Sequence, residues 1–229
     1  MVRLNQVGIG LVCILILLLM LSLHAGAQEW RSEDDGWTLS RRMGDVDIYR
    51  RPVEGSAFPA LLARAGIDAP VRAIHAVISD YAHFPDFIPS VRDSRILKQQ
   101  QATAWVYQRL GFPLMVADRH YVIRVSDTLA QADSGFIKVE WQLDRQQSRS
   151  LPSDGAVLPD AFSGSWQLTQ RQDRQASDAS YSIHVEPGGM LPAWLFSAAS
   201  EDYVFKVVEA VRRVVKERGG SFTKRSESG

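Results

Sequence analysis

Few residues in this sequence have the types and the spacing that catalysis or metal binding requires. Beyond the N-terminal segment 1–27 the histidines are scattered, and no pair has the spacing that metal ligands usually show: His75, His83, His120 and His184. The single cysteine, Cys13, lies in an apolar N-terminal stretch, and no serine stands in a nucleophile elbow. Ser163-Gly164-Ser165 is typical of a turn. The sequence therefore predicts no metal, no cofactor and no covalent catalytic residue.

Tyr107 and Arg109 are the polar groups best suited to act inside a pocket. They alternate with Trp105 in 102–110, a predicted strand, so the three side chains share one face. If that face points inward, Arg109 is a buried cation that needs a carboxylate or a ligand headgroup as its partner. If the other face points inward, Arg109 is a solvent-exposed charge. Both faces mix polar and apolar residues, so both orientations stay open.

Asp118 and Arg119 are adjacent charged residues at the start of the next predicted strand, 119–128. We expect them to form a structural pair rather than an acid–base pair.

Alternating segments dominate the chain and predict strands. In 135–144, one apolar set faces one way and a polar set faces the other: Ile137, Val139, Trp141 and Leu143 against Lys138, Glu140 and Gln142. Similar patterns predict strands at 45–49, 58–67, 94–99, 102–110, 119–128, 164–170 and 181–186. Short connections favour an antiparallel meander with one apolar face, which needs a cover.

The segment 192–218 is the only stretch long enough to cover that face. As a helix its 27 residues would extend about 40 Å. Its second half carries a stripe of branched residues, namely Val204, Val208, Val211 and Val215. Toward the N-terminus the same stripe passes small residues, Ser200, Ser197 and Ala193. Either neighbouring side chains fill this slender half, or a ligand cavity remains there.

Several residues near this slender half have two interpretations. The Ser197 and Ser200 hydroxyls either bond back to the preceding helical turn or offer polar groups to a ligand. Trp141 and Trp166 are either core residues or ligand contacts. Trp194 either closes a pocket mouth or anchors the helix start. The loop 146–161 either acts as a lid or is simply mobile.

The predicted fold class is α+β: a strongly curved antiparallel sheet around one long C-terminal helix. Two short helical segments are inserted after the second predicted strand. The first begins at Pro70, because proline favours the first position of a helix, and the second covers 81–89.

The N-terminus reads as a targeting segment. Arg3 precedes an apolar stretch at 7–23, and Ala25-Gly26-Ala27 is a small-residue cleavage site. The predicted organisation is a signal peptide at 1–27, a linker at 28–36, one domain at 37–218 and a flexible tail at 219–229. We expect an exported, periplasmic protein. The alternative is an uncleaved signal that anchors the chain in the inner membrane, because about 17 apolar residues can just span a bilayer.

The balance of basic and acidic residues bears on the class of partner. The chain carries 26 basic and 26 acidic residues, and removal of 1–27 takes away one basic residue, Arg3. This balance argues against nucleic acid as a partner. The predicted mature chain lacks cysteine, so its core must stabilise it without disulfides.

The order of several short motifs resembles a known family. They are Ile48-Tyr49-Arg50-Arg51, Ala69-Pro70-Val71, Asp118-Arg119-His120-Tyr121-Val122, Gly164-Ser165-Trp166-Gln167-Leu168 and 187–195. Over roughly 37–218 the chain is similar to bacterial StAR-related lipid-transfer (START) domains, in the superfamily that includes polyketide cyclases and aromatases. The resemblance implies the helix-grip fold and an apolar ligand between the sheet and the C-terminal helix. Family members usually show Arg-Asp where this chain has Arg119-His120, so Arg119 is expected to remain as a structural contact without an acidic neighbour.

The residues expected to contact a ligand combine these inferences: Trp105, Tyr107, Arg109, Tyr121, Ile123, Val139, Trp141, Trp166, Trp194, Ser197, Ser200 and Val204. The favoured function is a monomeric carrier of a lipid or other apolar small molecule that touches membranes transiently. One alternative is a cyclase or hydrolase in which Tyr107, Arg109 or His120 polarises the substrate. The other is an envelope interaction module with an empty cavity.

Overall fold

The computed structural model describes residues 36–112, 116–172, 175–189 and 193–226, and for 130–131, 193–199 and 220–226 it describes the backbone alone. The predicted signal peptide at 1–27 and nearly all of the predicted linker lie outside the described residues. No helix within the described ranges is long and apolar enough to cross a bilayer.

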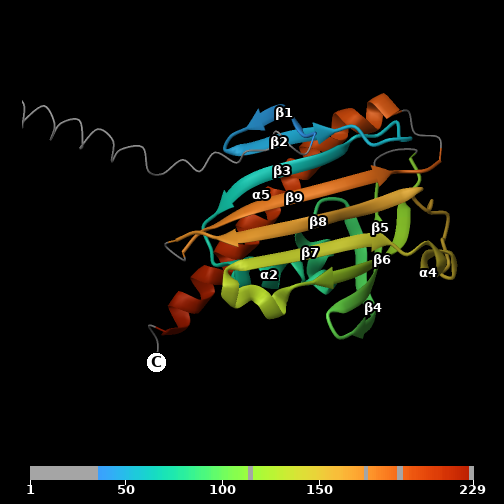
Figure 1. The fold of residues 1–229 in the computed structure, drawn as a ribbon. Helices are drawn as coiled ribbons and strands as arrows, with labels where there is room; N and C mark the ends of the chain where they lie inside the picture. The colour runs from blue at the N-terminus through green and yellow to red at the C-terminus, as the bar shows by residue number, and fades with distance from the viewer. Residues whose placement is uncertain (1–35, 113–115, 173–174, 190–192, 227–229) are drawn as a thin grey trace, which may run out of the picture. The chain divides into compact units, whose positions relative to one another are not determined.

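One antiparallel sheet of nine strands forms the framework (Figure 1). The strands are β1 (Thr38–Met43), β2 (Val46–Arg51), β3 (Ala60–Ile67), β4 (Val91–Gln100), β5 (Thr103–Leu110), β6 (Arg119–Asp127), β7 (Phe136–Leu143), β8 (Ala161–Gln170) and β9 (Ser177–Glu186). Their order in the sheet is β1-β2-β3-β9-β8-β7-β6-β5-β4. The first three strands therefore join the last two at the centre, and β4 to β8 complete the predicted meander.

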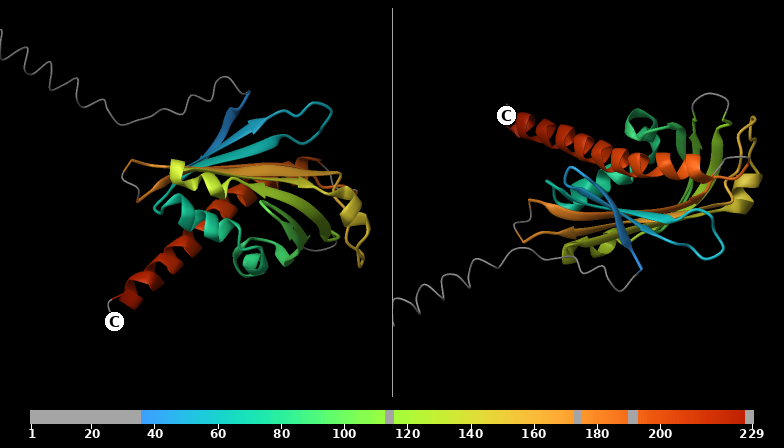
Figure 2. Two further views of the ribbon diagram at one scale, coloured as in Figure 1. Left: turned by 60° about the horizontal axis from the view of Figure 1, so that its bottom comes forward. Right: turned by 90° about the horizontal axis from the view of Figure 1, so that it is seen from above.

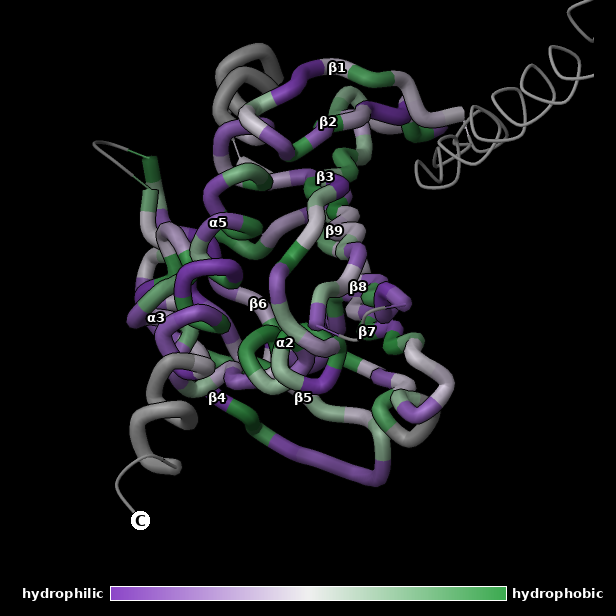
Figure 3. Tube along the Cα trace, turned by 90° about the vertical axis from the view of Figure 1, so that its left-hand side faces the viewer, coloured by the Kyte–Doolittle hydropathy of each residue, from purple (hydrophilic) through white to green (hydrophobic). Residues whose placement is uncertain are grey.

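The helices gather mainly on one face of this sheet. They are α2 (Val71–Ile78), η2 (Tyr81–His83), α3 (Phe84–Phe87), η3 (Leu129–Ser134), α4 (Arg145–Arg149) and α5 (Ala193–Ser226). Figure 2 shows α5 crossing the sheet with α2 and α3 on the same side, and Figure 3 shows α3 and α5 on one side of β7, β8 and β9. This arrangement confirms the predicted helix-grip fold. We call the covered side the helix face and the opposite side the far face.

Three elements differ from the sequence-based prediction. Strand β1 was not predicted, because its residues are exposed or nearly so and show no alternation. The short helices consequently follow the third strand rather than the second. Helix α5 continues to Ser226 rather than ending at Arg218, so its backbone extends into the segment predicted to be a flexible tail.

The valine stripe in the middle of α5 packs on the sheet. Val208, Val211 and Val215 are at most 6% exposed and belong to the hydrophobic core, together with Ile74 and Val77 of α2. These side chains pack against the strands, and of the three valines only Val211 also lines a cavity.

Charged residues hold α5 at two points along its length. Arg212 donates to the Gly66 carbonyl at 3.0 Å and to Asp45 at 2.8 Å. Nearer the N-terminus of the helix, Glu201 is 7% exposed and accepts from Arg50 and from Ser40 Oγ, each at 2.5 Å. These bonds tie the helix to β1, β2 and β3, and they fix its height above the sheet.

Candidate functional site

Two cavities lie between the helix face of the sheet and the N-terminal half of α5. The larger, which we call the mouth cavity, has a volume of about 370 Å³ and is lined mainly by apolar side chains. It reaches the surface beside Ser90 and Lys206, both exposed. Its helix wall is formed by Ser200, Tyr203, Val204 and Lys206. This volume falls within the range of about 300–1,000 Å³ typical of small-molecule sites.

The second, inner cavity is smaller, at about 70 Å³. It lies deeper, toward α2, η2 and α3, and its walls include Ile78, Tyr81 and Val207. Such a volume holds only a few water molecules, each of which occupies about 30 Å³ in the liquid.

Aromatic rings separate the two cavities. Tyr121, Phe162 and Tyr203 line both of them. The Tyr121 and Phe162 rings stack with centroids 4.5 Å apart and 29° between their planes. These side chains therefore form the partition, and moving them would join the two spaces.

Hydroxyl groups at this partition are neutral. Burial raises the pKa of Tyr121, Tyr181 and Tyr203, so all three remain protonated at neutral pH. Tyr121 Oη donates to Gln108 Oε1 at 3.1 Å, and Gln108 Nε2 donates to Ser94 Oγ at 3.4 Å. The interior thus offers hydrogen-bonding groups without charge, which suits a largely apolar ligand.

A stack of aromatic rings forms the floor of the inner cavity. The rings of Trp166 and Tyr181 lie 4.6 Å apart, and Trp141 lies 5.9 Å from Tyr181. Trp141 Nε1 is buried without a hydrogen-bond partner among the described residues. The Trp141 ring also lies against Gly164, where an added Cβ would be 2.8 Å from Trp141 Cε2. Glycine is needed at this position because no side chain fits between the ring and the strand.

The wall of the mouth cavity includes Arg119, the first residue of β6. Although only 4% exposed, its guanidinium donates to the Pro187, Ala117 and Gly188 carbonyls at 2.9, 2.5 and 2.8 Å. Gly188 has a φ of +65°, and an added Cβ would lie 2.8 Å from the Leu158 carbonyl. Arg119 thereby holds the segment that leads into α5, which agrees with the structural role expected from the resemblance.

Seven of the predicted contact residues line one or both cavities. Tyr121 lines both, Ile123, Val139, Trp141 and Trp166 line the inner cavity, and Ser200 and Val204 line the mouth cavity. Ser200 thus lies in the slender half of the helix, where the sequence left a cavity open as an interpretation, and Val204 is the first residue of the branched stripe that follows it. The side chains of Trp194 and Ser197 lie outside the described residues.

Three predicted contact residues do not reach the site. Trp105, Tyr107 and Arg109 point to the far face, because Val106 and Gln108 take the inward positions of β5. Trp105 Nε1 donates to Asp144 Oδ2 at 3.0 Å, and Tyr107 lies against Arg95 at 4.2 Å. They line neither cavity, so these three residues are corrected to structural positions.

The expected pair between Asp118 and Arg119 is also wrong. Asp118 instead accepts from Arg109 Nε at 2.8 Å, with Arg92 at 3.6 Å. Neighbouring strand residues point to opposite faces, so Asp118 turns to the far face while Arg119 turns to the cavity. The Arg109 hydrogen bond holds the pKa of Asp118 below its usual value.

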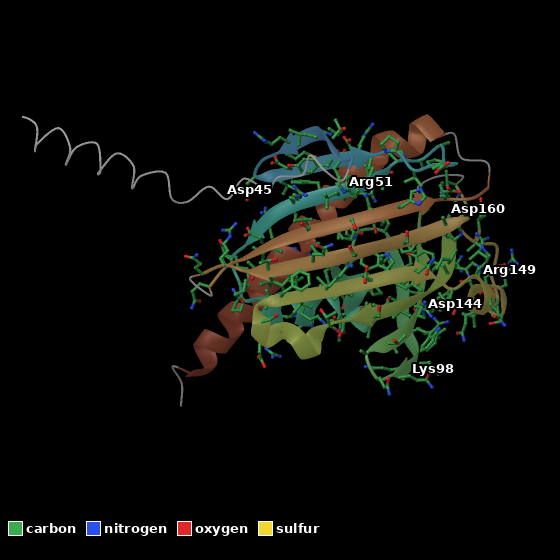
Figure 4. The ribbon with its side chains drawn as sticks, in the orientation of Figure 1. Asp45, Arg51, Lys98, Asp144, Arg149 and Asp160 are labelled. Carbon is green, nitrogen blue, oxygen red and sulfur yellow. The ribbon has the colours of Figure 1, made fainter. Side chains whose placement is uncertain are left out.

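The loop at 146–161 covers the far face rather than the mouth over most of its length. Asp144, the N-cap of α4, and Arg149, its last residue, are labelled in Figure 4 and mark where this segment begins. Ser148 Oγ accepts from the Val122 amide at 2.8 Å, and Val157 exchanges backbone bonds with Asp118 and His120 at 2.8 and 3.1 Å. The loop is therefore pinned to β6, and it contributes only Pro159 to the mouth cavity.

Sequence reasoning missed the partition residues Phe162 and Tyr203 and the rim residue Lys206. Phe162 precedes Gly164, at which the predicted strand began, whereas β8 starts at Ala161. Tyr203 and Lys206 lie beside the valine stripe of α5, and their hydropathy gave no sign that they face a cavity. Within the described ranges, no group of three or more His, Cys, Asp or Glu side chains is placed to hold a metal ion.

Comparison with known proteins agrees with this architecture. Residues 67–212 match the family described as polyketide cyclase / dehydrase and lipid transport. The chain belongs to this family.

Individual relatives extend the match over most of the chain. An uncharacterized protein of Pseudomonas aeruginosa is 27% identical over 184 residues, which cover 80% of this chain and 89% of the relative. The crystal structure of a STAR-related lipid transfer protein from Xanthomonas axonopodis is 26% identical, with a TM-score of 0.70 over 80% of this chain and 99% of that one. Human StAR-related lipid transfer protein 5 shares the fold at 12% identity, with a TM-score of 0.72 over 94% of this chain and 100% of that one.

Proposed function

We propose that this chain is an exported protein that binds a lipid or another apolar small molecule in the mouth cavity, for carriage or sensing. The observation that carries the proposal is the space of about 370 Å³ between the sheet and the slender half of α5, with its mainly apolar walls. Burial of apolar ligand surface there would drive binding, at about 25 cal/mol per Å² removed from water.

Two further observations support this function. The chain belongs to a family whose description includes lipid transport, and a similar crystal structure is that of a STAR-related lipid transfer protein. The apolar N-terminal stretch followed by Ala25-Gly26-Ala27 supports export.

The site geometry favours ligand binding over the cyclase or hydrolase activity that the sequence left open as an alternative. Tyr107, Arg109 and His120, the groups that would polarise a substrate, all belong to the far face and line neither cavity. Burial lowers the pKa of His120, and its Nδ1 is buried without a hydrogen-bond partner among the described residues.

Ligand extraction tests the proposal directly. The freshly purified protein is analysed by native mass spectrometry, and a solvent extract is analysed for lipids. The proposal expects an intact apolar molecule bound at about one per chain, and Ser200→Leu should remove it by occupying the cavity wall. Lys216→Leu, at an exposed position on the same helix, should retain the ligand. Protein that neither carries nor takes up any apolar compound would refute the function.

Export is tested separately. N-terminal sequencing of protein from the periplasmic fraction should begin at Gln28 if the segment is cleaved after Ala27. A protein found intact in the inner membrane would support the anchored alternative, and one found only in the cytoplasm would refute export.

A further inference from the structure

The lining of the mouth cavity carries an excess of positive charge. Its described residues include Arg50, Arg119 and Lys206, and no aspartate or glutamate. Arg50 is neutralised by Glu201, with 2.5 Å between Arg50 Nε and Glu201 Oε1. Arg119 and Lys206 are therefore the two cations whose charge is not balanced within this wall.

Arg119 is a buried cation held by neutral groups. All of its hydrogen bonds described above end on backbone carbonyls, and no carboxylate of the described residues lies within ion-pair distance. A buried charge normally requires an opposite charge, since desolvation alone costs several kcal/mol. Burial accordingly lowers the pKa of Arg119, although an arginine stays protonated at any physiological pH.

The Arg119 guanidinium also has donors to spare. A guanidinium has five N–H groups, and the three carbonyl bonds use one each from Nε, Nη1 and Nη2. One N–H of each terminal nitrogen is left for another acceptor. Carboxylate and phosphate oxygens match this pair of donors well.

Lys206 places a second cation on the opposite wall of the cavity. It belongs to α5, whereas Arg119 belongs to β6, and its side chain is exposed at the point where the cavity reaches the surface. It forms no ion pair with any carboxylate of the described residues. The two cations thus line a space whose other described lining residues are mainly apolar and include no other unbalanced charge.

From this distribution of charge we propose that the ligand is an anionic amphiphile. Its carboxylate or phosphate headgroup would lie near Arg119 and Lys206, and its alkyl chain would fill the mouth cavity toward Phe162 and Tyr203. This inference rests on the proposed function, because it specifies the chemistry of a ligand in that same cavity. It predicts discrimination by charge as well as by chain length.

Alkyl probes of equal length test the inference. Binding of decanoate, monodecyl phosphate and 1-decanol to the purified full chain is measured by titration calorimetry below their aggregation limits. The proposal expects at least one anion to bind about tenfold or more tightly than the alcohol, and added salt should reduce this preference. Tighter binding of decanoate would indicate a carboxylate ligand, and tighter binding of monodecyl phosphate a phosphate ligand.

Lys206→Met tests the position of the headgroup. It should weaken binding of the preferred anion several-fold and leave 1-decanol unchanged, while Lys216→Met on the same helix should change neither. Arg119→Lys keeps the charge but loses the paired donors, so folded variant protein should also bind the anion more weakly. Circular dichroism checks the fold of that variant, and the Lys206→Met result stands without it.

The outcomes separate the two proposals. Equal or tighter binding of 1-decanol would overturn the anionic ligand and leave the apolar carrier intact. A preference for anions that Lys206→Met leaves unchanged would place the headgroup elsewhere and overturn the assigned site. Absence of binding by every probe would count against the proposed function itself.

Discussion

Phe162 of β8 and Tyr121 of β6 stack with ring centroids 4.5 Å apart, and together they divide the interior into a mouth cavity and an inner cavity. The two residues come from strands separated in the sheet by β7. Their contact therefore depends on the curvature of the sheet, which brings the inward side chains of β6 and β8 together.

Removal of this partition should allow a longer ligand to bind. Phe162→Ala is expected to join the cavities and to shift the preference from decyl toward tetradecyl ligands, at a cost of about 2–4 kcal/mol in the free energy of unfolding. Phe58→Ala, which removes a ring from the mouth cavity alone, is the control and should leave the length preference unchanged. Titration with alkyl ligands of increasing length measures both variants, and identical preferences would show that the stack is no partition.

A matched pair of substitutions compares a position of α5 that lines a cavity with a position that packs on the sheet. Val204 and Val208 lie one turn apart and are each 1% exposed, but only Val204 lines a cavity. Val204→Phe should weaken ligand binding about tenfold or more with little change in stability, because the ring enters open space. Val208→Phe should destabilise by about 1–3 kcal/mol through overpacking. Equal destabilisation, measured by urea unfolding, would mean that the helix is packed equally along its length.

Glu201 should matter more to stability than its neighbour Asp202. Glu201 is 7% exposed and bound by Arg50 and Ser40, whereas the Arg41–Asp202 pair is about half exposed on both sides. Glu201→Gln is expected to lower the free energy of unfolding by about 1–2 kcal/mol, and Asp202→Asn by less than about 0.5 kcal/mol. Urea denaturation compares the two amides directly. Equal losses would show that burial of Glu201 adds nothing.

Asp118 should make stability depend on acid pH. Its pKa is lowered in the folded state, chiefly by the Arg109 hydrogen bond, so its contribution is fully present above the unfolded pKa and is lost as the pH falls through the folded value. Asp118→Asn is therefore expected to destabilise near neutral pH, and the difference from wild type should shrink below about pH 4. Unfolding curves from about pH 7 to about pH 3 measure this difference. The exposed Glu54, changed to Gln, is the control, and a difference independent of pH would contradict the assignment.

Replacing a tyrosine by leucine should affect ligand binding on the helix face of the sheet and stability on the far face. Tyr203→Leu removes a wall shared by both cavities and should weaken apolar ligand binding about tenfold. Tyr107→Leu removes a far-face ring that packs on Arg95 and His120, so it should lower stability and leave binding within about twofold. If Tyr107→Leu abolished binding in a protein that remained folded, the far face would have to contribute to the site.

Patterning predicted most of the sheet because most strands have one apolar side. The alternation of Ile137, Val139 and Trp141 identified β7 and the direction of its side chains. Strand β1 has no such side, since it is an exposed edge strand that β2 holds by backbone hydrogen bonds. Propensity and alternation cannot detect a strand of that kind.

The candidate site was less predictable because it depends on burial from both sides of the sheet. Tyr107 is 5% exposed although it points away from the helices, and Arg95 of β4 and His120 of β6 lie against its ring. A mainly polar loop gives no sequence signal that it will cover a sheet face, so the inward side of β5 could not be chosen. Arg119 was treated as structural alone, since its place on a cavity wall follows from the three-dimensional path of 187–189.

Gly164 affects how much space the interior leaves for a ligand. Because this position carries only hydrogen, the Trp141 indole can lie in close contact with β8. A single methyl group there would clash both with the Trp141 ring and with the Ser182 backbone carbonyl, so the ring or β9 would have to move. The position of one wall of the ligand space therefore depends on a strand residue that has no side chain, as well as on the helix that closes the chamber.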